Sequence, residues 1–264
     1  MVYKIYNQNN YASVPYPNKS NPAATIKTSG CGVCSMAMVM RNLAGIPITI
    51  ADLAAYSIKH GARASSGTNM RTLAAAIVKD YPELTYTTTN DEAALRRHLE
   101  AGGMAIMNAD GNDGVQGIFA AGGHYLAILG VRDGRPVIGD PAYTTNRYKS
   151  AYRRKYVTEL GDDLITCDWS TLDLDTKYRS PNYYLFTKKT EEKDMTEEQV
   201  RAIVRQELNG FGQDQLPSNW AVTELQEAKD AGITDGINPD SYVTREQAAV
   251  MSVRAAKAIG IKTK

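Results

Sequence analysis

The stretch Thr28-Ser29-Gly30-Cys31-Gly32-Val33-Cys34-Ser35-Met36-Ala37-Met38-Val39-Met40 sets the architecture of this chain. Two glycines flank Cys31, and helix-forming apolar residues follow until Gly45 and Pro47 end the pattern. We therefore predict that Cys31 lies in the first turn of a helix whose body is buried. The free N–H groups and the helix dipole at that end favour the thiolate, so Cys31 is a candidate nucleophile.

A hairpin that carries His124 and Asp140 is predicted far downstream of this helix. Apolar, β-branched residues favour strands over 122–131 and 135–139, and an Asp-Gly turn joins them. His124 opens the first strand and Asp140 follows the second, so we expect the two side chains to lie close together. With Cys31, the chain then holds a nucleophile, a base and an orienting carboxylate.

The residues between the Cys31 helix and this hairpin are predicted to be mainly helical. Apolar spacing favours helices over 49–58, 69–81 and 91–100, the last of them capped by Asn90. The first strand then follows at 104–107, so we expect the helices to precede the sheet. The Gly/Ser-rich residues 61–68 are predicted to form a loop that walls the substrate cleft.

Other interpretations of the candidate site residues stay open. Cys31 and Cys34 form a Cys-x-x-Cys pair, which is also typical of redox and zinc sites. The preceding residues 22–27 make a poor strand, and Cys167 has no neighbouring Cys or His, so we favour the nucleophile and assign Cys34 to packing. The alternative role of Asp140 is that of a plain turn residue before a proline.

Three motifs together resemble the papain-like cysteine peptidases of the bacteriocin-processing type. They are Ser29-Gly30-Cys31-Gly32, Gly122-Gly123-His124-Tyr125 and Gly139-Asp140-Pro141, and the match covers roughly residues 1–190. The resemblance implies an α+β papain-like fold of two lobes, with the Cys on a helical lobe and the His and Asp on an antiparallel sheet. It also implies an oxyanion-hole glutamine upstream of the Cys, and Gln8 is the only glutamine there.

The composition changes after the peptidase-like region. Residues 187–194 form a charged linker, so we divide the chain into a catalytic domain, residues 1–190, and a small helical domain with its linker, residues 191–264. Within the second domain we expect one apolar face, made by Trp220, Leu225, Ala228 and Ile233.

This second domain resembles a single S-layer homology repeat over roughly residues 215–260. The match rests on Trp220-Ala221, Ala231-Gly232-Ile233-Thr234-Asp235-Gly236, Pro239 and Thr244-Arg245-Glu246-Gln247-Ala248-Ala249-Val250-Met251. The resemblance implies binding to the secondary polymers of Gram-positive cell walls, with Trp220 and Arg245 as contact residues. Since the family packs three repeats together, we also expect a homo-oligomer, or assembly with tail fragments translated from Met195.

Several classes of partner are disfavoured by the sequence. The formal net charge of +1 and the lack of a basic groove pattern argue against nucleic acid. No apolar run reaches the length of a membrane span, and the first residues lack a signal-peptide core, so we expect a cytoplasmic protein.

Residues 108–114 are rich in oxygen ligands, but Asp113 and Phe119 stand where an EF-hand needs Gly and a carboxylate. We therefore predict neither a metal nor another cofactor.

The resemblances together imply a peptidoglycan hydrolase of the endolysin type. It would cut an amide bond in the peptide part of the wall, after a holin releases it from the host cytoplasm. Two alternatives remain: a non-catalytic wall-adhesion module with a degenerate peptidase fold, and a leader-peptide maturation protease. The basic and tyrosine-rich residues 144–156 are either a solvated hairpin or a contact with an anionic wall polymer.

Overall fold

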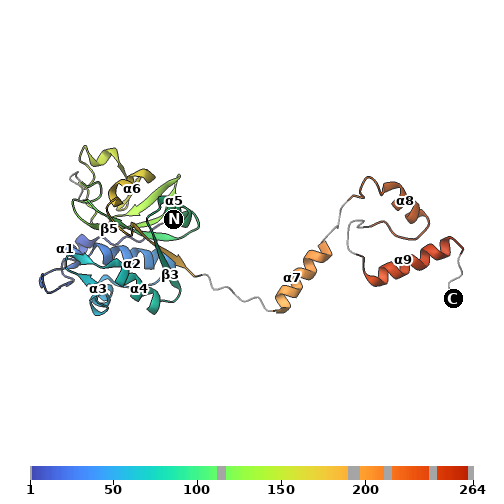
Figure 1. Ribbon diagram of the computed structural model, residues 1–264, viewed down its shortest axis with the longest axis horizontal. Helices are drawn as coiled ribbons and strands as arrows, with labels where there is room; N and C mark the ends of the chain where they lie inside the picture. The colour runs from blue at the N-terminus through green and yellow to red at the C-terminus, as the bar shows by residue number, and fades with distance from the viewer. Residues whose placement is uncertain (1, 112–116, 190–196, 211–215, 238–242, 261–264) are drawn as a thin grey trace. The chain divides into compact units, whose positions relative to one another are not determined.

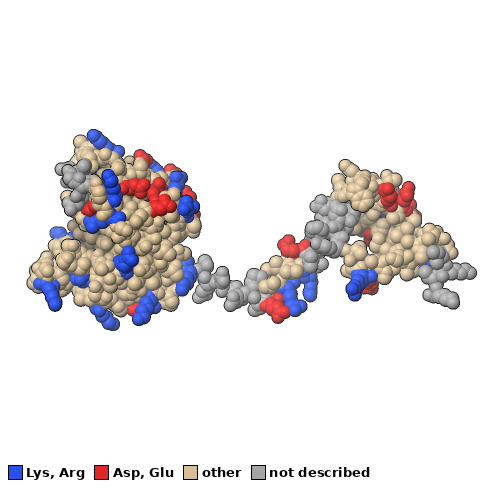
Figure 2. Space-filling view, viewed as in Figure 1, with Lys and Arg blue, Asp and Glu red and all other residues tan. Residues whose placement is uncertain are grey.

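The computed structural model describes residues 2–111, 117–189, 197–210, 216–237 and 243–260. The chain divides into two compact units, Met1–Thr190 and Glu191–Lys264 (Figure 1). On the face of the first unit seen in Figure 2, acidic and basic side chains lie close together on the upper part, and mainly basic ones lie on the lower part.

A seven-stranded antiparallel sheet forms the centre of the first unit, in the order β3-β9-β4-β5-β6-β8-β7. Its strands are β3 (Leu84–Thr89), β4 (Met104–Ala109), β5 (His124–Arg132), β6 (Arg135–Gly139), β7 (Val157–Gly161), β8 (Leu164–Cys167) and β9 (Tyr183–Lys188). A separate two-stranded hairpin joins β1 (Arg63–Ala64) to β2 (Gly67–Thr68). The expected α+β class, with its large antiparallel sheet, is confirmed.

The sheet is buried on both faces because successive side chains of its central strands point to opposite sides. In β4, Met104 and Ile106 pack into one core, and Ala105 and Met107 pack into the other. The first core joins the sheet to α2 (Cys31–Ala44), α3 (Ile50–Lys59) and α4 (Met70–Asp80). The second core lies under α5 (Glu92–Glu100) and α6 (Trp169–Thr176).

Helix α2 is the buried helix that the sequence predicts. It begins at Cys31 and its residues from Gly32 to Met40 are all buried. Gly45 ends it in the left-handed conformation, with a φ of 75° that a residue with a Cβ rarely adopts. The helix packs against β5 in the middle of the sheet, which brings its first turn to the edge where β5 also begins.

Two details of the expected order of elements are wrong. The N-cap of α5 is Asp91, whose side chain accepts a hydrogen bond from the backbone N–H of Ala93, whereas Asn90 accepts one from the backbone of Asn182. Strand β3 lies between α4 and α5, so the helices do not all precede the sheet. The remaining short elements are η1 (Gln8–Tyr11), α1 (Ile26–Ser29) and η2 (Arg153–Lys155).

The second unit contains α7 (Glu197–Gly210), α8 (Val222–Asp230) and α9 (Arg245–Ala258). Thr244 caps α9 with a reciprocal pair of hydrogen bonds to Gln247. None of the residues of this unit whose burial is described is buried. Of the expected apolar face, Leu225, Ala228 and Ile233 are half-buried, whereas Trp220 is 82% exposed. Within the described part of the chain, no helix is long and apolar enough to cross a membrane.

Candidate active site

Cys31 is the first residue of α2 and is half-buried. The glycines on both sides allow neighbouring elements to approach it closely. A Cβ on Gly32 would lie 2.7 Å from the Cβ of Thr68 in β2, and a Cβ on Gly30 would lie 2.5 Å from the carbonyl oxygen of Ile26. Neighbouring backbone and side-chain atoms thus pack closely around Cys31 at the N-terminus of a buried helix. The partial positive charge at this end of the helix favours the thiolate.

The hairpin β5–β6 brings His124 and Asp140 together. His124 opens β5, Asp140 follows β6, and the turn at Asp133 and Gly134 joins the two strands with positive φ at both residues. The Nε2 atom of His124 lies 2.7 Å from Oδ1 of Asp140, and the two side chains are 6% and 0% exposed. This bond leaves Nδ1 of His124 as the ring nitrogen available to Cys31.

Asp140 is held by further groups that the sequence analysis missed. The Tyr148 hydroxyl donates a hydrogen bond of 2.6 Å to its Oδ2 atom, and Nε of Arg147 lies 2.5 Å from the same oxygen. The backbone N–H of Ala142 donates to Oδ1 at 2.9 Å. Residues 144–156 therefore do not form the solvated hairpin of the sequence analysis, since Tyr148 is buried and Arg147 pairs with the buried carboxylate.

These contacts change the acidity of all three candidate catalytic groups. Burial raises the pKa of Cys31, but the hydrogen bond and charge of His124 outweigh it and hold that pKa below its usual value. Burial lowers the pKa of His124, but Asp140 and Cys31 raise it to about 9. Burial raises the pKa of Asp140, whereas His124 and Arg147 lower it to about 2. The arrangement therefore favours the ion pair of a thiolate and an imidazolium over the neutral thiol and imidazole.

Gln8 lies between the Asp140 turn and the helix that precedes Cys31. Its backbone N–H donates a 2.6 Å hydrogen bond to the carbonyl of Pro141. Its side-chain Nε2 atom donates one of 2.8 Å to the carbonyl of Lys27. An amide nitrogen carries two hydrogens, so this bond leaves one for another acceptor. The oxyanion role of Gln8 stays a prediction.

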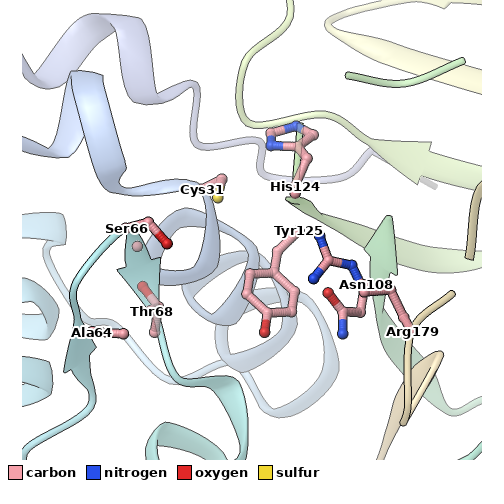
Figure 3. Close-up of a pocket in the computed structure, with 10 residues that line it drawn as sticks. Cys31, Ala64, Ser66, Thr68, Asn108, His124, Tyr125 and Arg179 are labelled. Atoms are coloured by element: carbon pink, nitrogen blue, oxygen red, sulfur yellow. The ribbon is translucent and has the colours of Figure 1, made fainter. Parts of the chain in front are cut away.

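A pocket of about 250 Å³ opens at Cys31 and His124 (Figure 3). Its other lining residues are Ala64, Ser66, Gly67, Thr68, Asn108, Gly123, Tyr125 and Arg179. The Gly/Ser-rich loop between α3 and α4 forms one wall, as the sequence predicts, since it folds into the β1–β2 hairpin. A peptide that reaches Cys31 would thus lie between this hairpin and the start of the sheet.

The two residues assigned to wall binding lie in the second unit. Trp220 lies in a turn before α8, and Arg245 is the first residue of α9. Both are exposed. Their contact with a wall polymer stays a prediction.

The oxygen-rich loop is only partly described, because residues 112–116 lie outside the described ranges. Of its described residues, Asp110 pairs with Arg179 at 3.2 Å. Among the described residues, no group of three or more His, Cys, Asp or Glu side chains is placed to hold a metal ion.

Comparison with known proteins identifies the family. The model of the Peptidase_C39 like family matches residues 3–160, which include Cys31, His124 and Asp140. The chain belongs to this family, and the first unit is therefore a domain of the cysteine peptidase class. A search of curated proteins finds no match.

Two solved structures are similar to part of the chain. One is the peptidase domain of Streptococcus ComA, a bi-functional ABC transporter involved in a quorum sensing pathway; it is 14% identical, with a TM-score of 0.37 over 60% of this chain and 91% of that one. The other is a putative C39-like peptidase from Bacillus anthracis; it is 16% identical, with a TM-score of 0.38 over 61% of this chain and 90% of that one.

Proposed function

We propose that this chain is a peptidoglycan hydrolase of the endolysin type, which cleaves an amide bond in the peptide part of Gram-positive cell walls. The observation that carries the catalytic part is the bond between His124 and Asp140 beside a cysteine at a helix N-terminus. The proposed wall target rests on the resemblance of residues 215–260 to an S-layer homology repeat.

The proposed reaction begins when the Cys31 thiolate attacks the carbonyl carbon of the scissile amide. Protonated His124 then gives its proton to the leaving amine as the C–N bond breaks, and an acyl-enzyme thioester remains. Neutral His124 next takes a proton from water, whose oxygen attacks the thioester and releases a carboxylic acid. Asp140 keeps the imidazole oriented and stabilises its charged form through both steps.

The negative charge that develops on the substrate oxygen needs hydrogen-bond donors. The backbone N–H of Cys31 is a candidate because the first N–H groups of a helix have no partner within the helix. Gln8 supplies the second proposed donor, since its amide is anchored beside the helix by the carbonyl of Lys27. In this scheme no cofactor is needed.

The test is mass spectrometry of Gram-positive cell walls digested with the full-length protein. We expect fragments with new amino and carboxyl ends in the peptide part. Cys31→Ala should release none and still sediment with the walls, whereas Cys34→Ser should keep most of the activity, because Cys34 is buried in the core. New reducing sugar ends, or lysis by folded Cys31→Ala, would contradict the proposed chemistry.

The wall-binding part needs its own measurement. Full-length Cys31→Ala can be mixed with purified walls, and the bound fraction compared with that of the double variant Cys31→Ala/Arg245→Ala. Loss of a charge-assisted hydrogen bond at a desolvated contact should weaken binding by about 1.5–3 kcal/mol. Equal binding by the two proteins would remove Arg245 from the proposed contact.

A further inference from the structure

Arg179 forms part of the pocket that contains Cys31, although the peptidase mechanism gives it no role. Figure 3 shows its guanidinium on the side of the pocket formed by Tyr125 and Asn108, opposite Thr68 and Ser66. The side chain is 33% exposed. A charged group placed here would meet any substrate that reaches the thiol.

The guanidinium of Arg179 is held in place by an ion pair, but not all of its N–H donors have partners. Its Nη2 atom lies 3.2 Å from Oδ1 of Asp110, whose side chain is 14% exposed. The same nitrogen lies over Gly123, where a Cβ would approach it to 2.5 Å. Its buried Nε atom makes no hydrogen bond to any described residue. An arginine has five N–H donors in a rigid plane; the pair with Asp110 uses one at Nη2 and the donor at Nε is buried, so the donors left for a ligand are those of Nη1 and the second one of Nη2.

The charge of the pocket wall favours an anion at this point. None of the ten lining residues is Asp or Glu, and Arg179 is the one Arg or Lys among them. The thiolate and imidazolium of Cys31 and His124 contribute opposite charges that largely cancel. A ligand carboxylate beside Arg179 would thus meet a fixed cation in a half-buried site, where a guanidinium binds carboxylates with two parallel hydrogen bonds.

We propose that Arg179 forms a subsite that binds a carboxylate group of the substrate close to the scissile amide. The inference rests on the proposed peptidase function and narrows its substrates to peptides with a free carboxylate near the cut bond. The simpler role for Arg179 is a brace that holds Asp110 against the strand edge. A brace needs only the pair with Asp110 and would leave the wild-type pocket with no preference between a carboxylate and a neutral ligand of the same shape, whereas a carboxylate subsite would prefer the carboxylate.

Two alkylating reagents of nearly equal size separate these roles. Iodoacetate carries a carboxylate where iodoacetamide carries a carboxamide, and both alkylate the Cys31 sulfur with loss of iodide. Modification of Cys31 is followed by peptide mass spectrometry, since Cys34 and Cys167 are buried and have raised pKa values. The quantity to compare is the ratio of the iodoacetate rate to the iodoacetamide rate.

In Arg179→Met, which keeps the length of the side chain but not its charge, this ratio should fall about tenfold. Arg179→Lys keeps the positive charge but lacks the planar guanidinium with its paired N–H donors, so the ratio should fall less than in Arg179→Met. The control is Lys177→Ala, which removes an exposed cation two residues away that does not line the pocket, and its ratio should equal that of the wild type. An unchanged ratio in folded Arg179→Met would overturn the proposal.

A measurement on the wild-type protein covers the case in which Arg179→Met does not fold. Propionate should protect Cys31 from iodoacetamide at concentrations where propionamide does not, and Arg179→Lys should weaken this protection. Equal protection by the two compounds would also overturn the proposal. Neither experiment uses hydrolysis, so the subsite and the proposed wall hydrolysis can fail separately. A protein without hydrolytic activity could still react faster with the anionic reagent because of Arg179, and a hydrolytically active one could lack this preference.

Discussion

Tyr148 and Arg147 make Asp140 a fixed, charged group instead of a turn residue. A buried carboxylate is costly unless opposite charge and hydrogen bonds compensate for its lost hydration. Here His124, Arg147, Tyr148 and a backbone N–H supply that compensation. The carboxylate can therefore stay ionised at 0% exposure and keep the imidazole in one orientation.

The first prediction at this scale concerns Tyr148→Phe, which removes only the hydroxyl that donates to Asp140. Oδ2 of Asp140 would keep Arg147 but lose the hydroxyl, and the loss of this hydrogen bond to a buried charge should cost about 1–3 kcal/mol in the free energy of unfolding, measured by denaturant at neutral pH. Asp140 has a lowered pKa, so its contribution to stability is present above its ordinary 3.8 and is lost as the pH falls towards about 2. Without the hydroxyl, the pKa of Asp140 should be lowered less. On acidification the variant should therefore unfold at a higher pH than the wild type.

The matched control is Tyr143→Phe. The Tyr143 hydroxyl donates to the half-buried residue Glu159, which keeps its pair with Lys149, so its loss should change the stability by less than about 1 kcal/mol. If Tyr148→Phe matched this control in stability and in acid unfolding, the hydroxyl would have no part in holding Asp140.

The second prediction concerns the pH dependence of catalysis. In the proposed mechanism the active form has a Cys31 thiolate and a protonated His124, so kcat/KM should rise through the lowered pKa of the thiol and fall near the His124 pKa of about 9. The charge of Asp140 raises the pKa of His124. In Asp140→Asn the falling limb should therefore move to lower pH, and the maximum rate should drop because the ring is less well oriented.

The measurement is hydrolysis of purified walls from about pH 5 to about pH 10.5, a span that brackets the ordinary pKa values of histidine and cysteine. Cys31 alkylation by iodoacetamide over the same span reports the thiolate without hydrolysis. A falling limb that stays in place in Asp140→Asn would mean that another group controls it.

At the scale of elements, local signals predict the two segments that carry the candidate site. The α2 helix has glycine at both ends and an apolar body, and the β5–β6 hairpin has an Asp-Gly turn that suits its positive φ angles. Both predictions are confirmed because they depend on neighbouring residues. Their meeting at one edge of the sheet follows from the packing of α2 on β5, which the chain order alone does not specify.

The elements that were missed depend on distant partners. Strand β3 pairs with β9, about a hundred residues away, and its threonine-rich sequence is only weakly apolar. The roles of residues 147 and 148 also depend on distant partners, because the surrounding sequence is basic and rich in tyrosine and favours an exposed surface. Their burial is decided by contact with Asp140 and by the second core, so that only the folded sheet could reveal their role.

The third prediction tests the close contact between α2 and β2. Alanine favours helix over glycine, so helix propensity alone would make Gly32→Ala stabilising. The new Cβ would instead lie 2.7 Å from the Cβ of Thr68, and the α2 and β2 backbones would have to separate. We expect a loss of about 1–3 kcal/mol in the free energy of unfolding and slower alkylation of Cys31.

Gly122→Ala is the control for this substitution. A Cβ on Gly122 would meet no atom within 4 Å, and this residue needs no positive φ, so its change should stay within about 0.5 kcal/mol. A Gly32→Ala variant as stable as the wild type, or more stable, would show that helix propensity offsets or outweighs the contact at this point.

At the scale of the whole molecule, the second unit contrasts with the first in how much apolar surface it leaves exposed. None of its residues whose burial is described is buried, and several large apolar side chains are 40% or more exposed. These are Val200, Ile203, Val204, Leu216, Trp220, Val222, Ile237, Val243, Val250, Val253 and Ile259. Exposed apolar surface on this scale is typical of segments that associate with a partner.

The fourth prediction is that this surface is covered by further copies of the same unit. The S-layer homology resemblance implies repeats that pack around a shared axis, and a small domain gains the core it lacks by such association. Full-length chains can supply the copies, and so can fragments that start at Met195, which lies outside the described residues. Several wall-binding units on one catalytic domain would raise wall avidity without new contacts.

The natural gene, expressed with a C-terminal tag, should give a second, shorter band on denaturing gels and a mixed assembly in native mass spectrometry. Changing the Met195 codon to one for leucine should remove the short band. Trp220→Ser should weaken the assembly, because the variant has less apolar surface to bury between copies. Cys31→Ala serves as the control, because Cys31 lies in the first unit and its loss should leave the assembly unchanged. A strictly monomeric species at all protein concentrations would refute the association, whereas an assembly of full-length chains alone would refute only the internal start.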